Sequence, residues 1–159
     1  MFKKLLTTRS LCVSAIIAAL YAALTILLAP ISYGNIQLRV SEAMTLLPML
    51  LPQAIPGLFV GCLIANLYTG MLTDIVFGSL ATLIAAIGTY CLRSKPVLAA
   101  ACPVVANGVI VGLVLSVAFK LPVALTMVEV AAGEIGAVLI GFALLAALKG
   151  AKIDLRKLG

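Results

Sequence analysis

Long apolar runs, separated by short breaks rich in glycine, proline or charge, limit the fold of this chain more than any other feature. They cover residues 11–29, 42–52, 54–69, 74–92, 97–118 and 123–148. A hydrocarbon core about 30 Å thick is crossed by about 20 apolar residues in a helix, and several runs reach or approach this length. The chain is therefore predicted to be an all-α membrane protein. A transmembrane barrel would need segments that alternate apolar and polar residues, and the stretch 138–148 does not alternate.

Composition supports the same class, since 64% of the 159 residues are hydrophobic and the mean hydropathy is +1.29. The net charge of +6 could suggest a nucleic-acid partner, but the basic residues flank the apolar runs, as the positive-inside rule predicts for cytoplasmic ends. They are Lys3, Lys4 and Arg9 before the first run, Arg93 and Lys95 between runs, and Lys149, Lys152, Arg156 and Lys157 after the last. We expect no nucleic acid as a partner.

The number of crossings depends on how residues 42–69 are divided. A single helix of this length would be about 42 Å long, so we divide it into two, with Pro48 expected to kink the first. Six transmembrane helices then place both termini and the basic 93–95 break in the cytoplasm. We expect one domain over 1–159. The run 11–29 is longer than the apolar part of a signal peptide, which favours a retained first helix.

Acidic residues inside or at the rim of the apolar runs give the first indication of function. A charge is costly in hydrocarbon, so an acid kept there usually faces a cavity, a partner or a substrate. The acids are Glu42, Asp74, Glu129 and Glu134, and the amides Asn66 and Asn107 also lie within apolar runs. No motif with four cysteines or histidines at metal-binding spacing is present, so we expect neither a metal nor a cofactor.

Two further patterns predict contacts. In the loop 30–41, Asn35, Gln37, Arg39 and Ser41 alternate with apolar residues, which indicates an extended segment with one wet face, laid across a cavity mouth as a gate. An ordinary loop with chance alternation is the competing interpretation. In the first helix, small residues recur every fourth position at Ala15, Ala19 and Ala23. Such a stripe permits close approach of another helix, either of a partner protein or of this chain itself.

Sequence blocks across residues 10–148 resemble the QueT family, the substrate-binding (S) components of energy-coupling-factor (ECF) importers for queuosine precursors. The most specific blocks lie within YGNIQLRVSEAMTLLP and DIVFGSLATL, while PGLFVGCLIANLYTG, ANGVIVG and GEIG add weaker support. The resemblance implies six helices, cytoplasmic termini and a substrate cavity near the outer face of the cell membrane. It also implies a transmembrane coupling protein and two cytoplasmic ATPases as partners, with the coupling protein docking on the alanine stripe. Glu129 departs from the small or apolar residue expected at its position.

The substrate implied by the resemblance is a 7-deazaguanine bearing an aminomethyl group, such as preQ1. Its guanine edge carries neighbouring N–H donors that a carboxylate can accept, and its ammonium group pairs with a second carboxylate. The predicted substrate-binding residues are therefore the acids, amides and loop residues Glu134, Asp74, Asn107, Asn66, Glu42, Arg39, Gln37 and Asn35. Tyr33, Tyr68 and Phe77 are candidates for stacking on the base or for anchoring at the membrane interface. No nucleophile and base pair and no phosphate loop are present, so ATP hydrolysis is expected only in partner subunits.

Structural explanations compete with each of these assignments. Arg39 and Glu42 could pair with each other, and Asp74 could cap a helix. The two amides could join helices, and Glu134 could have a purely structural partner. At the level of function, the alternative is a self-sufficient ion- or proton-coupled carrier or channel in which the acids relay ions.

Overall fold

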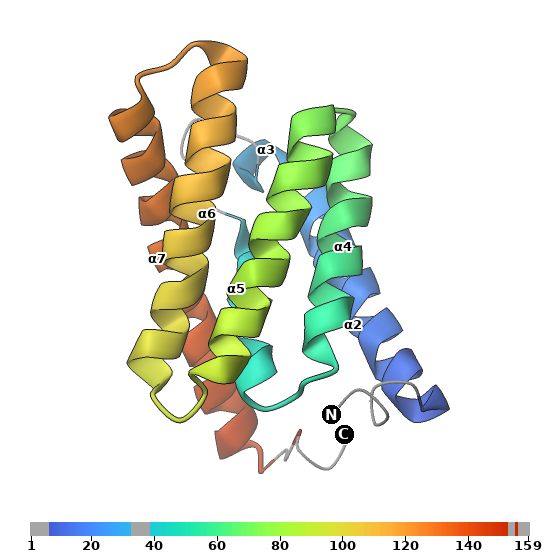
Figure 1. The fold of residues 1–159 in the computed structure, drawn as a ribbon. Coiled ribbons are helices and arrows are strands. Elements are labelled where there is room, and N and C mark those ends of the chain that lie inside the picture. The colour runs from blue at the N-terminus through green and yellow to red at the C-terminus, as the bar shows by residue number, and fades with distance from the viewer. Residues whose placement is uncertain (1–6, 33–38, 153–154, 156–159) are drawn as a thin grey trace.

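The computed structural model describes residues 7–32, 39–152 and 155, and the described elements are all helical (Figure 1). The long helices begin and end at residues with clear local causes. Thr7 caps the first helix through its side chain, Gly70 ends another in the left-handed conformation at φ 71°, and Pro96 begins a third. In chain order the elements are α2 (Thr8–Leu27), α3 (Ala29–Ser32), η1 (Val40–Met49), α4 (Ala54–Thr69), η2 (Asp74–Gly78), α5 (Ser79–Cys91), α6 (Pro96–Phe119) and α7 (Val123–Gly150).

The helices form an up-and-down bundle in which α4, α5, α6 and α7 alternate in direction (Figure 1). Helix α2 begins and α7 ends at the same end of the bundle, where the 92–95 connection also lies. The connections 70–73 and 120–122 lie at the opposite end. Within the described residues, four helices are long and apolar enough to cross a membrane: 8–27, 74–91, 96–119 and 123–150. Helix α4, with 16 residues, is shorter.

The segment η1 lies where the sequence predicts the second helix, over 42–52, but it is neither α-helical nor exposed to lipid. It is a 3₁₀-helix of 10 residues that contains Pro48, and at about 2 Å per residue it covers only about 20 Å. Residues 41–48 are all buried, and η1 contacts α2, α4, α5, α6 and α7. It therefore lies in the interior of the bundle, in contact with the five long helices. The count of six crossings remains a prediction.

Close packing of α2 against α4 depends on two glycines of α4 spaced by four residues. A Cβ atom at Gly61 would lie 2.8 Å from the backbone oxygen of Ala18, and one at Gly57 would lie 2.7 Å from that of Ser14. Only glycine leaves room for backbones this close, which is the small-xxx-small geometry of membrane helices. The intramolecular contact of α2 therefore uses the Ser14 and Ala18 side of the helix, next to buried Tyr21.

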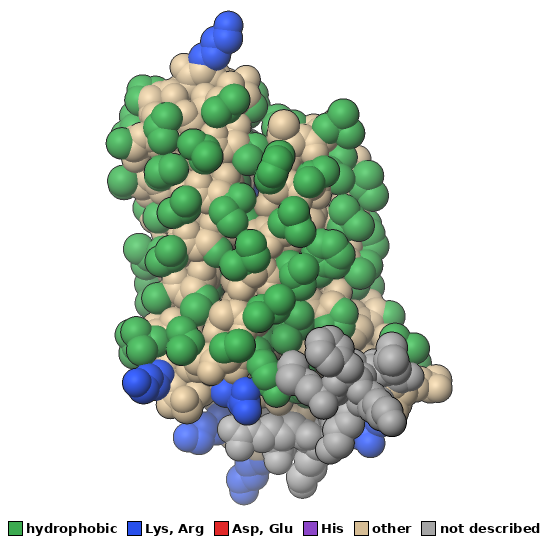
Figure 2. All heavy atoms as spheres, in the orientation of Figure 1, with side chains coloured by type: hydrophobic (Ala, Val, Ile, Leu, Met, Phe, Trp, Pro, Cys, Tyr) green, Lys and Arg blue, Asp and Glu red, His purple; other side chains and the backbone are tan. Residues whose placement is uncertain are grey.

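The exterior of the bundle is mainly apolar, as expected for a surface in contact with lipid (Figure 2). On the face shown in Figure 2, Lys and Arg side chains gather at the end where α2 begins and α7 ends, whereas exposed Lys120 belongs to the connection at the opposite end. The asymmetry matches the cytoplasmic end that the positive-inside rule predicts. The chain is thus a multi-pass membrane protein, while its orientation stays a prediction.

Candidate substrate-binding site

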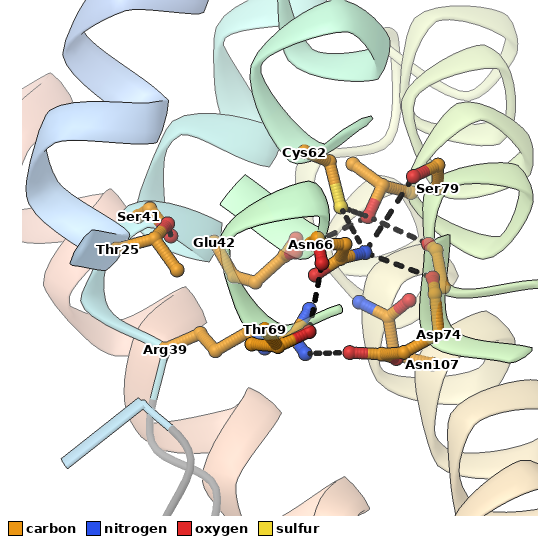
Figure 3. Close-up of polar contacts among 12 residues, drawn as sticks. Thr25, Arg39, Ser41, Glu42, Cys62, Asn66, Thr69, Asp74, Ser79 and Asn107 are labelled. Atoms are coloured by element: carbon orange, nitrogen blue, oxygen red, sulfur yellow. Dashed lines mark hydrogen bonds and ion pairs between the residues drawn. The ribbon is translucent and has the colours of Figure 1, made fainter. Parts of the chain in front are cut away.

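Buried polar side chains from six elements converge around η1 inside the apolar bundle (Figure 3). The first group joins the N-terminal end of η1 to η2 and α4, near the 70–73 connection. The Arg39 Nη2 atom donates to Asp74 Oδ2 at 2.9 Å, and both side chains are about 95% buried. Asn66 Nδ2 on α4 donates to the backbone oxygen of Asp74 at 2.9 Å and lies 3.5 Å from Ser79 Oγ. A guanidinium, a carboxylate and an amide therefore meet beside the 70–73 connection.

The local backbone makes room for the Asp74 carboxylate. The segment η2 is a short π-helical turn, a wide geometry that is frequent at functional sites. A Cβ atom at Gly78 would lie only 2.6 Å from Asp74 Oδ1 and 3.0 Å from Asn66 Nδ2. The Asp74, Gly78 and Ser79 positions of the DIVFGSL block thus all contribute to this group.

The second group is centred on Glu42, whose side chain is only 1% exposed. Its Oε1 atom accepts hydrogen bonds from the Tyr21 hydroxyl on α2 and from Thr82 Oγ1 on α5, the latter at 3.2 Å. A neighbouring contact also joins α2 to η1, because Thr25 Oγ1 donates to Ser41 Oγ at 2.6 Å. The orientation of Glu42 is therefore set by hydroxyl donors from two different helices.

The third group joins α6 to α7. Asn107 Nδ2 donates to Glu134 Oε1 at 2.8 Å, with both side chains buried. The Asn107 amide also interacts with the Glu42 carboxyl, and the charges of Arg39 and Glu42 act on Glu134. Glu134 lies 11 residues into α7, about 16 Å along its axis. The third group therefore lies deep in the bundle and interacts with residues of the first and second groups.

The carboxyl groups of Asp74, Glu42 and Glu134 share one arrangement. In each, one oxygen accepts a hydrogen bond from a protein donor, and the other oxygen has no described donor. Asp74 Oδ1, Glu42 Oε2 and Glu134 Oε2 are buried without a hydrogen-bond partner among the described protein atoms, as are the amide oxygens of Asn66 and Asn107. A buried acceptor without a donor costs about 1–3 kcal/mol. Such a set of acceptors is chemically suited to a ligand that carries several N–H donors.

The charges of the cluster also favour a ligand that carries N–H donors. The cluster holds three carboxyls and one guanidinium, and that guanidinium is paired with Asp74. Glu42 and Glu134 therefore have no protein cation of their own in the cluster. Because ions in a low-dielectric interior need compensation, the cluster favours a positively charged partner over an anion.

The structure brings together most of the predicted residues, namely Arg39, Glu42, Asn66, Asp74, Asn107 and Glu134. Asn35, Gln37 and Tyr33, with most of the predicted gate, lie outside the described residues. Tyr68 and Phe77 are 65% and 49% exposed, so their described side chains do not line this cluster. Glu129 is half-buried. Because it lies five residues before Glu134 in α7, it is on a different face of the helix.

Some of the structural alternatives are also decided. Arg39 does not pair with Glu42 but with Asp74, which is 35 residues away. Asp74 does not cap its helix, because Thr73 occupies the N-cap position and no side chain forms a capping hydrogen bond there. The two amides do form contacts between elements, and Glu134 does have a protein partner.

Tyr21 and Thr82 were missed by the sequence analysis. A hydroxyl side chain within an apolar run does not by itself indicate a binding site, because it can hydrogen-bond to the backbone of its own helix. Thr82 does so with the Gly78 oxygen at 3.2 Å. For Tyr21, the feature that could have indicated a buried role is a tyrosine within an alanine-rich helix. Its full burial distinguishes it from tyrosines at a membrane interface.

The alanine stripe of α2 lies on the outer surface. Ala15, Ala19 and Ala23 are exposed, whereas Ala18 and Ala22 are buried. The exposed stripe is therefore separate from the face that packs on α4. Its predicted role in docking is compatible with this position and stays a prediction.

Comparison with known proteins gives two matches. The family model described as QueT transporter matches residues 11–150. The Queuosine precursor transporter QueT of Lactococcus lactis subsp. cremoris (strain MG1363) is 40% identical over 72 residues, which are 44% of this chain and 43% of that protein. The alignment thus covers less than half of this relative's length. No solved structure matches the chain.

Proposed function

The chain belongs to the QueT transporter family, and on this premise we propose that it is the substrate-binding subunit of an ATP-driven ECF importer in the cell membrane. It would capture a queuosine precursor of the 7-deazaguanine type at the outer face. The observation that carries the proposal is the buried cluster of three carboxyls, each with one oxygen held by a protein donor and one without.

The two halves of the cluster match the two ends of an aminomethyl-7-deazaguanine. Asp74 Oδ1 and Asn66 Oδ1 are acceptors for the ring N–H and exocyclic amino group, while the Arg39 guanidinium is a donor for the carbonyl oxygen. Glu42 and Glu134 supply carboxylates for the ammonium group, where a charge-assisted bond is strongest. Asparagine and carboxylate acceptors without protein donors support this placement.

A binding measurement on the purified chain tests the proposal. Calorimetry should show binding of 7-aminomethyl-7-deazaguanine, weaker binding of 7-deazaguanine and no binding of an acidic purine derivative. Glu134→Gln should cost about 2–5 kcal/mol of binding free energy, as for one member of a buried charged pair. Glu129→Gln is the matched control on the same helix and should keep the wild-type affinity. Wild-type affinity of Glu134→Gln would remove this residue from the site.

The proposed partners are a transmembrane coupling protein, which docks on Ala15, Ala19 and Ala23, and two cytoplasmic ATPases. The exposure of this stripe and its small side chains support close helix approach. In this arrangement the partners hydrolyse ATP. Co-expression followed by co-purification tests the assembly.

A self-sufficient ion- or proton-coupled carrier or channel is the second candidate, favoured by the excess of acids over arginine among the buried residues that the structure describes. Reconstitution separates the two functions. A carrier would take up the deazapurine into liposomes driven by an ion gradient with no other protein present. A binding subunit would bind the compound but accumulate it only with partner proteins and ATP.

A further inference from the structure

The contact between Asn107 and Glu134 has unmatched acceptors on both of its side chains. Asn107 Nδ2 donates to Glu134 Oε1 at 2.8 Å. The other oxygen of each group, Asn107 Oδ1 and Glu134 Oε2, is buried with no hydrogen-bond partner among the described atoms. A proton on Glu134 Oε2 would convert one of these two acceptors into a donor. A proton on Glu134 therefore leaves one unmatched acceptor in this pair in place of two.

Glu42 and Glu134 differ in how the protein supports a negative charge on them. Two hydroxyls, from Tyr21 and Thr82, donate to Glu42 Oε1, whereas Glu134 receives one amide donor. Donors favour the charged form of a carboxyl, and a nearby like charge disfavours it. Of these two interacting glutamates, Glu134 is the one suited to hold a proton.

Among the described residues, the groups around Glu134 supply no counter-charge other than the Arg39 guanidinium, which is paired with Asp74. Of the described elements, α6 and η1 make most of the contacts with α7. The first presents the uncharged Asn107, and the second presents Glu42 together with Arg39, whose guanidinium is paired with Asp74. An ionised Glu134 would thus add a second carboxylate beside Glu42 in a water-poor interior.

We propose that Glu134 is a proton-binding site that exchanges its proton for a cationic substrate. In the ligand-free protein Glu134 is a neutral acid. When a ligand with an ammonium group binds, the Glu134 O–H bond breaks, the proton leaves to solvent, and the carboxylate accepts an N–H bond from the ligand. One proton leaves for each positive charge that enters, so the net charge of the buried cluster does not change. The inference rests on the proposed function for the identity of the ligand but not for the protonation of Glu134.

Infrared spectroscopy tests the ligand-free state directly. The carbonyl band of a protonated carboxyl should be present in the wild type, absent in Glu134→Gln and retained in Glu129→Gln, which makes the same change at a half-buried position. Equal bands in the wild type and Glu134→Gln would overturn the proposal. If Glu134→Gln does not fold, the same band is followed in the wild type as ligand is added, and a band that persists at saturation overturns the exchange.

Calorimetry in buffers of different ionisation enthalpy counts the released protons. Binding of 7-aminomethyl-7-deazaguanine should release about one proton, and its affinity should rise about tenfold per pH unit while the free site is protonated. Uncharged 7-deazaguanine should release none. Binding of the aminomethyl compound without proton release would refute the exchange. If no deazapurine binds at any pH, the proposed function fails, and the infrared band still decides whether Glu134 holds a proton.

Discussion

Replacing Gly61 by alanine should destabilise the bundle, although alanine is the better helix former. The new Cβ atom would lie 2.8 Å from the Ala18 backbone oxygen, 2.8 Å from Tyr21 Cβ and 3.0 Å from Ala18 Cα. None of these atoms can be moved by a change of side-chain rotamer. Helix α2 as a whole must therefore shift away from α4.

The size of the effect follows from two opposing terms. Alanine in place of glycine gains about 1 kcal/mol of helix propensity. Overpacking of a tight contact costs about 1–3 kcal/mol, and the upper part of this range applies because two of the three contacts are with backbone atoms. The net loss is about 2 kcal/mol, which corresponds to a fall in Tm of about 4–8 °C for a protein of this size.

Thermal unfolding in detergent, followed by circular dichroism, measures this change. Gly150→Ala is the matched control, since a Cβ atom there has no neighbour within 4 Å, and its stability should stay within about 0.5 kcal/mol of the wild type. Gly57→Ala combined with Gly61→Ala should cost less than the sum of the two, because one shift of α2 relieves both contacts. A Gly61→Ala protein as stable as the wild type would refute the packing argument.

Three other substitutions probe the site and the outer stripe. Tyr21→Phe removes a donor from Glu42 and should weaken binding of the aminomethyl ligand by about 1.5–3 kcal/mol, measured by calorimetry, with little effect on an uncharged analogue. Arg39→Ala should destabilise the fold by about 3–5 kcal/mol because Asp74 is left as an unpaired buried charge. The double variant Arg39→Met, Asp74→Leu removes both charges and should lose less stability. An equal loss in the double variant would contradict this cause. Ala19→Trp should block co-purification with the coupling protein while ligand binding by the isolated subunit persists, and undiminished co-purification would place the docking face elsewhere.

The long helices could be predicted from sequence because their limits carry local signals. The run 54–69 coincides with α4, and 97–118 and 123–148 fall within two residues of the ends of α6 and α7. Gly70, Pro96 and Pro122 stand at these limits, where they favour helix ends or beginnings. The first run, 11–29, lies two to three residues C-terminal to α2.

The nature of η1 could not be predicted in the same way. Hydropathy reports how apolar a segment is, but not whether lipid or protein surrounds it. A run of 11 residues is ambiguous in length, and the enclosure of η1 by five helices is a property of the whole bundle.

The residues of the candidate site were easier to predict than the contacts between them. Each acid was identified because a charge in an apolar run needs a reason. The pairing of Arg39 with Asp74 joins residues 35 positions apart, and the local alternative of a pair with Glu42 had the more obvious spacing. The role of Tyr21 likewise depends on a contact 21 residues away, which no pattern within α2 reveals.

The enclosed position of η1 has a consequence for how the chain enters the membrane during synthesis. Ten residues that carry Glu42, preceded by Arg39, are too short and too costly to be released into lipid as an independent segment, since one central charge adds about 2.5–3.5 kcal/mol to insertion. Only residues 50–53 separate η1 from α4, so we expect the two to leave the translocon together as a hairpin. Glu42 can meet Tyr21 of α2 at this stage, but its contact with Thr82 and the pair of Asn107 with Glu134 form only after α5, α6 and α7 have been made, so the candidate cluster is completed at the last step of biogenesis.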